Sequence, residues 1–227
     1  MIMELPKKYE SPFARVKNGI LEIYRKERFE DLMYELTYAL KKRRCIYCGK
    51  KLKRSNSTLD HRYPRDTGGI SITNNLFPCC CKCNSAKSNL THNEYLKIRS
   101  LSAKEKKAYL KELSQYRERI MRKIGFKLPR KWVTFEDINT IKYQKMITDL
   151  RGKRYCRIVE FYQKYGKLPK PVIVDKSNYL LDGYNIILFA KDYKIKKIPV
   201  IKLENVKLVD NKKGYWYSSF WIKKIKK

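Results

Sequence analysis

Apolar positions recur at helical spacing in several segments of the chain. The first segment predicts an amphipathic helix over residues 29–40, followed by a basic run at 41–44. Its apolar positions are Phe29, Leu32, Met33, Leu36 and Leu40. Residues 45–84 differ, because they are rich in Cys, Gly, Asn and Ser and contain only short β-prone pieces. A small metal-binding module is therefore expected there.

Two further helix starts carry a capping box, in which a hydroxyl residue is followed by glutamate three positions later. Thr91 precedes Glu94, and Ser102 precedes Glu105. Each pair can satisfy two amide groups that the first helical turn leaves without partners, so we expect helices to begin at both places. The second should run to about Ile124, with Gly125 as its stop and with lysine and arginine on its outer face.

The turn at 128–130 is expected to begin a second unit, because a proline disfavours helix at the residue before it. Beyond it the patterns predict helices over 136–150, 155–165 and 184–193, and strands over 172–174, 179–181 and 198–203. Alternation of this kind predicts an α/β arrangement. Residues 214–227 interleave aromatic residues with lysines, which fits either a packed terminal strand or a base-stacking segment.

Composition narrows the class of protein. The 227 residues include 54 Lys and Arg against 22 Asp and Glu, a formal net charge of +32. Because 43% of the residues are hydrophobic, a folded core is expected, and the charge should lie on its surface. Such an excess favours a polyanionic partner, most often nucleic acid. The most apolar run, 179–190, is shorter than the roughly 20 residues of a membrane span, and the charged first ten residues do not resemble a signal peptide.

Four of the seven cysteines form two CxxC pairs, Cys45 with Cys48 and Cys80 with Cys83. Two such pairs are typical of a tetrahedral zinc site, which is structural because sulfur fills every coordination position. Metal binding would supply much of the folding free energy of so short a module. Cys81 leaves one alternative open, in which a CxC pair takes part in the site.

Between the two pairs lie residue types that suit phosphodiester hydrolysis. This reaction needs an activated water and neutralisation of the phosphate charge. His61, one of two histidines in the chain, can accept a proton near pH 7, and the neighbouring Asp60 offers a hard oxygen ligand that suits magnesium. An isolated Asp-His pair is often only a hydrogen-bonded pair, so the surrounding motif has to decide between the two interpretations.

Taken in order, CxxC, DHxxP, GG, NL and CxxCNxxK resemble the pattern of the HNH endonucleases over residues 45–94. The resemblance implies a ββα-metal fold, also called a His-Me finger. It implies His61 as the general base, Asp60 and Asn84 as ligands of a catalytic magnesium or manganese ion, and a 5′-phosphate product. Asn75 would brace the hairpin and orient the base. Asn84 stands where the family name has its last histidine.

Basic residues near the motif are expected to contact DNA, the substrate that the resemblance implies. Residues 41–65 contain ten Lys or Arg and one acid. Arg62, Arg65 and Lys87 are predicted phosphate contacts, with solvated surface as the equal alternative. Contacts of this kind are independent of sequence and weaken steeply with salt. His92 fits neither metal pattern and is expected to be a plain surface histidine.

The C-terminal half resembles, more weakly, the ParB-like nuclease fold shared with sulfiredoxin. The resemblance is carried by residues 170–175, 179–184 and 198–201, which predict a strand, a DG turn and a further strand. In that family histidine and arginine follow the turn and grip phosphates, whereas Asn185 and Ile186 follow it here. We therefore expect this half to support DNA contact or target choice without binding nucleotide.

The sequence as a whole predicts an α+β protein with an N-terminal helical extension (1–44), an HNH nuclease module with basic helices (45–127) and a ParB-like α/β domain (128–227). It predicts a metal-dependent DNA endonuclease of the homing, restriction or phage type. A cytoplasmic, nucleoid-associated location is expected, with no membrane partner and no small-molecule cofactor. The alternative is a noncatalytic, zinc-dependent nucleic-acid-binding or regulatory protein. Cutting both strands would require a dimer, because one motif is present.

Overall fold

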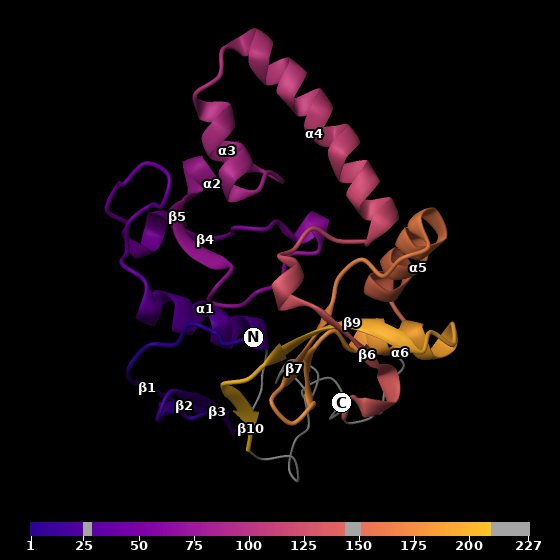
Figure 1. The fold of residues 1–227 in the computed structure, drawn as a ribbon. Coiled ribbons are helices and arrows are strands. Elements are labelled where there is room, and N and C mark those ends of the chain that lie inside the picture. The colour runs from indigo at the N-terminus through magenta and orange to yellow at the C-terminus, as the bar shows by residue number, and fades with distance from the viewer. Residues whose placement is uncertain (25–28, 144–150, 210–227) are drawn as a thin grey trace, which may run out of the picture.

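The structure of the protein is a computed structural model that describes residues 1–24, 29–143 and 151–209. Its helices are α1 (Phe29–Leu40), α2 (Cys81–Lys87), α3 (His92–Arg99), α4 (Ala103–Lys123), α5 (Lys153–Tyr165) and α6 (Tyr184–Asp192). Its strands are β1 (Tyr9–Glu10), β2 (Ala14–Lys17), β3 (Ile20–Ile23), β4 (Ser57–His61), β5 (Leu76–Cys80), β6 (Thr134–Asp137), β7 (Val172–Asp175), β8 (Leu180–Asp182), β9 (Lys197–Leu203) and β10 (Val206–Leu208). Helices and sheets are mixed, as the α+β class requires (Figure 1).

The described strands form three sheets. β4 and β5 make an antiparallel hairpin, in which Asp60 lies opposite Phe77 and His61 opposite Leu76. A second sheet has the order β6-β9-β7-β8, and a third has the order β1-β2-β3-β10. Within the described ranges, no helix is both long and apolar enough to cross a membrane.

The first 44 residues contain more than the expected helical extension. α1 occupies the predicted range, but β1, β2 and β3 precede it, and β3 runs parallel to β10 from the other end of the described chain. Leu21 and Ile23 of β3 are fully buried, while Ile20 and Glu22, which alternate with them, are half-buried. This is the period-two pattern of a strand with one covered face, in a run too short to predict from sequence.

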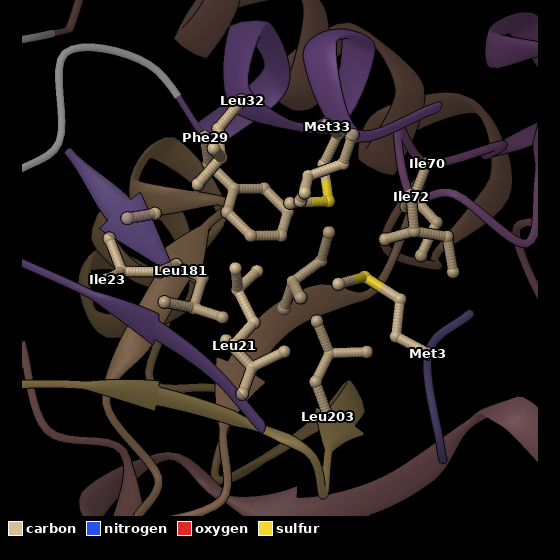
Figure 2. Packing of buried hydrophobic residues seen from close by; sticks show 14 of the residues in the cluster. Met3, Leu21, Ile23, Phe29, Leu32, Met33, Ile70, Ile72, Leu181 and Leu203 are labelled. Carbon is tan, nitrogen blue, oxygen red and sulfur yellow. The ribbon is translucent and has the colours of Figure 1, made fainter. Parts of the chain in front are cut away.

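One hydrophobic cluster joins the N-terminal segment, the loop before β5 and the C-terminal strands. Figure 2 shows Phe29 and Met33 of α1 facing Leu21 of β3, Ile72 of the loop and Leu203 of β9, all within this cluster. Burial of one such side chain contributes about 1.5–3 kcal/mol. The loop end of the hairpin, where β4 ends at His61 and β5 begins at Leu76, therefore lies beside a core that the flanking segments complete. The boundaries of the three parts expected from the sequence, 1–44, 45–127 and 128–227, stay a prediction.

The second half has the expected α/β arrangement over residues 172–203, with β7 between β8 and β9. α5 and α6 pack together, and the ring centroids of Tyr162 and Phe189 lie 5.1 Å apart. The prediction of a helix over 136–150 is wrong for the described residues 136–143. Residues 134–137 form β6, which pairs antiparallel with β9, because ladder hydrogen bonds outweigh a weak helical pattern. Residues 144–150 and 214–227 lie outside the described residues.

Both capping boxes are present, and α4 ends at Lys123 before Gly125, which has a φ of +92°. The first box also holds α3, α4 and the segment after α4 together. Glu94 accepts hydrogen bonds from the Thr91 amide at 2.7 Å, Arg117 at 2.9 Å and Lys127 at 2.5 Å. Burial alone would raise the pKa of Glu94, but these three donors lower it to about 2.

Glu94→Gln is expected to reduce the free energy of unfolding at pH 7 by about 2 kcal/mol. The contribution of a carboxylate with a depressed pKa is complete above its usual value of 4.5 and is lost as pH falls toward about 2. The difference between the wild type and the variant should therefore shrink as pH falls from about 4.5 to about 2. Urea unfolding at several pH values measures it, and Glu105→Gln, in the exposed second box, is the matched control. Equal effects of the two substitutions would contradict the role given to the ion pairs.

Candidate active site and metal centre

The hairpin β4-β5 and the helix α2 form a ββα unit. Asp60 and His61 end β4, β5 returns antiparallel, and α2 begins at once, with Cys80 as its N-cap residue. Adjacent residues of a strand point to opposite faces, so Asp60 turns inward, where it is 4% exposed, and His61 turns the other way and is half-buried. The two side chains are therefore held in different surroundings by the same strand end.

The four predicted cysteines come together. The sulfur atoms of Cys45, Cys48, Cys80 and Cys83 all lie within 4.8 Å of one another, and those of Cys48 and Cys80 are 3.9 Å apart. Zinc–sulfur bonds of about 2.3 Å in a tetrahedron place sulfur atoms about 3.8 Å apart, so this cluster fits structural zinc. Cys81 lies outside the cluster, and its thiol instead faces the Asn56 carbonyl at 3.7 Å.

The electrostatics at Cys45 suit a metal ligand. Burial would raise the pKa of its thiol, but hydrogen bonds from backbone amides, chiefly that of Cys80, bring the pKa down to about 6. The buried Cys79 shows the reverse, because burial and the neighbouring Cys45 raise its pKa. A thiolate is the form that binds zinc. Burial raises the pKa of Cys83 as well, so it is the placement of the sulfur atoms, with Cys79 outside the group of four, that separates the ligand cysteines from the spare one.

Tyr47 links the cysteine cluster to Asp60. It lies between the two cysteines of the first CxxC pair, its ring packs edge-on against Tyr95 with centroids 4.9 Å apart, and its hydroxyl donates to Asp60 Oδ2 at 2.5 Å. Burial, and next the hydrogen bond to Asp60, raise the pKa of Tyr47, which keeps its proton on the donor. Sequence analysis missed this residue, because only the fold brings position 47 beside position 60.

Lys87 is the second partner of Asp60. Its ammonium group donates to Asp60 Oδ1 at 2.8 Å and to the carbonyl of His61 at 3.0 Å, and its side chain is 1% exposed. The sequence suggests Lys87 as a phosphate contact, whereas its buried ammonium neutralises Asp60 and ties α2 to the end of β4. We therefore assign Lys87 a structural role, in which it connects α2 to the end of β4 beside Asp60.

Lys87→Met is expected to reduce the free energy of unfolding by about 3–5 kcal/mol, because it leaves Asp60 as a buried charge without its counter-ion. The double variant that adds Asp60→Asn should recover much of this loss, since the uncompensated charge is then gone. Urea unfolding of the zinc-loaded proteins measures both. Lys82→Met, at an exposed position of the same helix, is the control. A loss no larger than that of Lys82→Met would contradict this account.

The surroundings of His61 keep its imidazole neutral. Its Nε2 atom lies 2.9 Å from the Ser71 hydroxyl. Burial is the main cause that lowers the pKa of His61 to about 4; Asp60 opposes the shift and Lys87 adds to it. At neutral pH the ring therefore has one nitrogen with a free lone pair, as a proton acceptor requires.

Asn75 braces the loop between β4 and β5. It is fully buried, accepts a hydrogen bond from the Tyr63 amide at 2.8 Å, and donates to the carbonyls of Tyr63 at 3.1 Å and Ile70 at 2.8 Å. The same loop requires glycine at position 69, in the glycine pair of the motif, because a Cβ there would lie 1.9 Å from the Tyr63 carbonyl oxygen. The predicted bracing position thus has the contacts that such a role needs.

Asn84 lies on the face of α2 that covers Asp60. Its amide nitrogen is 3.3 Å from the Thr58 hydroxyl, and Thr58 shares a face of β4 with Asp60. Among the described residues, nothing else bonds the Asn84 side chain. A carboxylate offers about four acceptor positions, of which Tyr47 and Lys87 use two at Asp60. The amide oxygen and the remaining carboxylate positions are hard donors that fit a divalent ion.

The predicted arginines and His92 lie around this site. Arg62 is exposed, and Arg65, whose side chain is 56% exposed, pairs with Glu30 of α1. His92 is not the plain surface residue that the sequence suggests. It is half-buried, its ring centroid lies 5.3 Å from that of Tyr47, and its amide donates to the Arg62 carbonyl at 2.9 Å. Burial, and next Arg62, lower its pKa.

Comparison with known proteins gives a match for this unit. Residues 45–90 match the model of the family described as HNH endonuclease, which supports nuclease activity in general. No curated protein matches the chain. A solved structure of a Pnob8-like ParB-N domain aligns with 31% of this chain and 28% of its own at 16% identity and a TM-score of 0.26. We draw no functional conclusion from a similarity at that level.

Proposed function

We propose that the protein is a metal-dependent endonuclease that hydrolyses phosphodiester bonds in DNA. The observation that carries the proposal is the ββα unit, in which Asp60 and His61 end β4 and α2, which carries Asn84, packs against that strand. The match of residues 45–90 to HNH endonucleases supports it. The cysteine cluster supports a separate structural role for zinc in the same segment.

The proposed roles follow from the chemistry of each side chain. His61 accepts the proton of the attacking water, and Asn75 keeps the loop that follows it in place. Asp60 and Asn84 would hold a magnesium or manganese ion. When bound, the ion supplies charge neutralisation at the phosphate and at the departing oxygen. The products would carry a 5′-phosphate and a 3′-hydroxyl.

The ion pair between Lys87 and Asp60 is the observation that favours the noncatalytic alternative. A buried ammonium already offsets the charge of Asp60, so a divalent ion has to compete with it. A zinc-dependent DNA-binding protein with an idle site would show the same ion pair. Binding and cleavage therefore have to be measured on the same sample.

The experiment compares supercoiled plasmid incubated at low salt with magnesium, with manganese and with EDTA. The proposed function predicts nicked or linear DNA in both metals and none in EDTA. Gel-shift measurement on the same preparations reports binding. Binding without cleavage across plasmid and varied linear DNA would overturn the nuclease and leave the binding protein.

The long helix α4 is the proposed DNA contact outside the ββα unit. It extends from α3 toward α5, at the opposite end of the molecule from β1 and β2 (Figure 1). Its exposed basic residues are Lys104, Lys107, Lys111, Arg119, Arg122 and Lys123. Cations spaced along one helix can neutralise successive phosphates without reading the base sequence.

Replacement of Lys107, Lys111 and Arg119 by glutamine is expected to weaken DNA binding at low salt. The slope of log affinity against log salt should fall in size by about 0.9 for each phosphate that the variant no longer neutralises. Fluorescence anisotropy at several salt concentrations measures both quantities. The matched control removes the same charge far from α4, at Lys7, Lys8 and Lys17. Equal slopes for the two triple variants would show that α4 makes no special contribution.

A further inference from the structure

A group of polar side chains from two separate segments is connected through Ser71 to the imidazole of His61. Ser71, from the loop before β5, lies 2.9 Å from His61 Nε2. Its hydroxyl donates to Glu30 Oε1 at 3.2 Å, and Arg65 lies 3.4 Å from the same hydroxyl while it pairs with Glu30. Glu30 belongs to α1, outside residues 45–90, so the family match does not account for it.

The capacity of the Ser71 hydroxyl decides how the group is arranged. A hydroxyl has one proton to donate and two lone pairs that can accept. Glu30 is an ionised acceptor, so it takes the single proton, and Arg65 can only donate, so it occupies one lone pair. The other lone pair is left for His61, and Nε2 must then carry the proton that it donates.

This arrangement leaves Nδ1 as the nitrogen with a lone pair. In the part of the chain that the structure describes, no group forms a hydrogen bond with Nδ1 of His61. An imidazole that is free to exchange tautomers would present an accepting nitrogen in the right place only part of the time. A fixed Nε2–H tautomer keeps Nδ1 available as the accepting nitrogen at all times, and the hydrogen bond to Ser71 also fixes the orientation of the ring.

The hydrophobic core holds both ends of this group in place. Ser71 lies between Ile70 and Ile72, and Glu30 follows Phe29; these three apolar residues belong to the same buried cluster (Figure 2). The distance between the Ser71 hydroxyl and the Glu30 carboxylate is therefore set by packing rather than by flexible loops. Ser71 itself is 9% exposed, which limits competition from water.

We infer that Ser71 and Glu30, assisted by Arg65, are positioning residues that fix the tautomer and orientation of His61. The N-terminal helix α1 thereby completes a site whose other parts lie in the ββα unit. The effect on catalysis rests on the proposed function, whereas the tautomer of His61 does not. Arg65 is thus assigned to this group in place of a phosphate contact.

The first test is the nitrogen NMR spectrum of the histidine rings in the whole zinc-loaded protein. The chain has two histidines, so His92 serves as an internal reference. The inference predicts that neutral His61 carries its proton on Nε2 in the wild type. Ser71→Ala should mix the two tautomers, and Ser71→Thr, which keeps the hydroxyl, should restore the wild-type spectrum. A proton on Nδ1 in the wild type, or an unchanged spectrum in Ser71→Ala, would overturn it.

The second test separates this role from a loss of folding. Ser71→Ala is expected to lower kcat on the order of 10- to 100-fold with KM for DNA unchanged, and Ser71→Thr should recover the rate. Glu30→Ala should also lower kcat. The control Ser57→Ala removes a β4 hydroxyl that contacts Tyr38 instead. Loss of rate in Ser57→Ala equal to that in Ser71→Ala would overturn the inference. If the wild type does not cleave DNA, the proposed function is refuted. The nitrogen NMR spectrum then still tests whether Ser71 fixes the tautomer of His61.

Discussion

His61→Ala is expected to reduce the rate of DNA cleavage by about 10²- to 10⁴-fold, the range typical of a lost general base. The ring is half-buried, and burial favours its neutral form by lowering its pKa to about 4. It contributes a proton acceptor and no charge, so DNA affinity should change little. Cleavage under single-turnover conditions, with binding measured by anisotropy, checks both quantities.

His92→Ala is the matched control for this prediction, because it removes the same side chain near the same site. Its ring packs on Tyr47, whereas the Ser71 hydroxyl is hydrogen-bonded to His61. A much smaller loss of rate is expected. If the two alanine variants cleaved at the same rate, His61 would not be the base. If His61→Ala lost binding as completely as cleavage, a structural role would explain the result.

Cys45→Ser is expected to destabilise the protein by about 5 kcal/mol or more, because zinc binding supplies folding free energy wherever a short segment cannot bury a core of its own. Tyr47 lies two residues from Cys45 and hydrogen-bonds Asp60. Loss of the metal should therefore release the end of β4 and abolish cleavage. Thermal unfolding should show a midpoint lower by at least about 10 °C, since 1 kcal/mol shifts it by about 2–4 °C at this chain length.

The matched control for this substitution is Cys81→Ser, at an exposed cysteine outside the cluster. It should leave the midpoint and the zinc content unchanged. A strong chelator should lower the midpoint of the wild type toward that of Cys45→Ser. Equal midpoints for the two serine variants would contradict the four-cysteine site, and metal analysis showing full zinc in Cys45→Ser would do the same.

Features with a local cause could be predicted from the sequence. The bounds of α1 follow from apolar spacing, the starts of α3 and α4 follow from their capping boxes, and the cysteine cluster follows from two CxxC turns. In each case the residues that decide the structure lie within a few positions of one another. Asp60, His61, Asn75 and Asn84 are proposed as site residues because the order and spacing of the motif resemble the HNH pattern.

Features that depend on distant contacts could not be predicted. β3 pairs with β10 from the other end of the described chain, and nothing in either short run specifies the partner. The same holds for the burial of Lys87 against Asp60, which reverses the expectation for a lysine in a basic chain. Glu30 and Ser71 are 41 positions apart and meet only because a shared core brings α1 to the loop.

The most direct test of the central claim is the chemistry of the DNA ends. The zinc-loaded wild-type protein is incubated with duplex DNA and manganese in water enriched in heavy oxygen, and the products are analysed by mass spectrometry. Hydrolysis predicts 5′-phosphate ends that carry one heavy oxygen atom from the solvent, 3′-hydroxyl partners, and no product with EDTA or with His61→Ala. Intact DNA in manganese and in magnesium, with the protein bound to it, would contradict the claim.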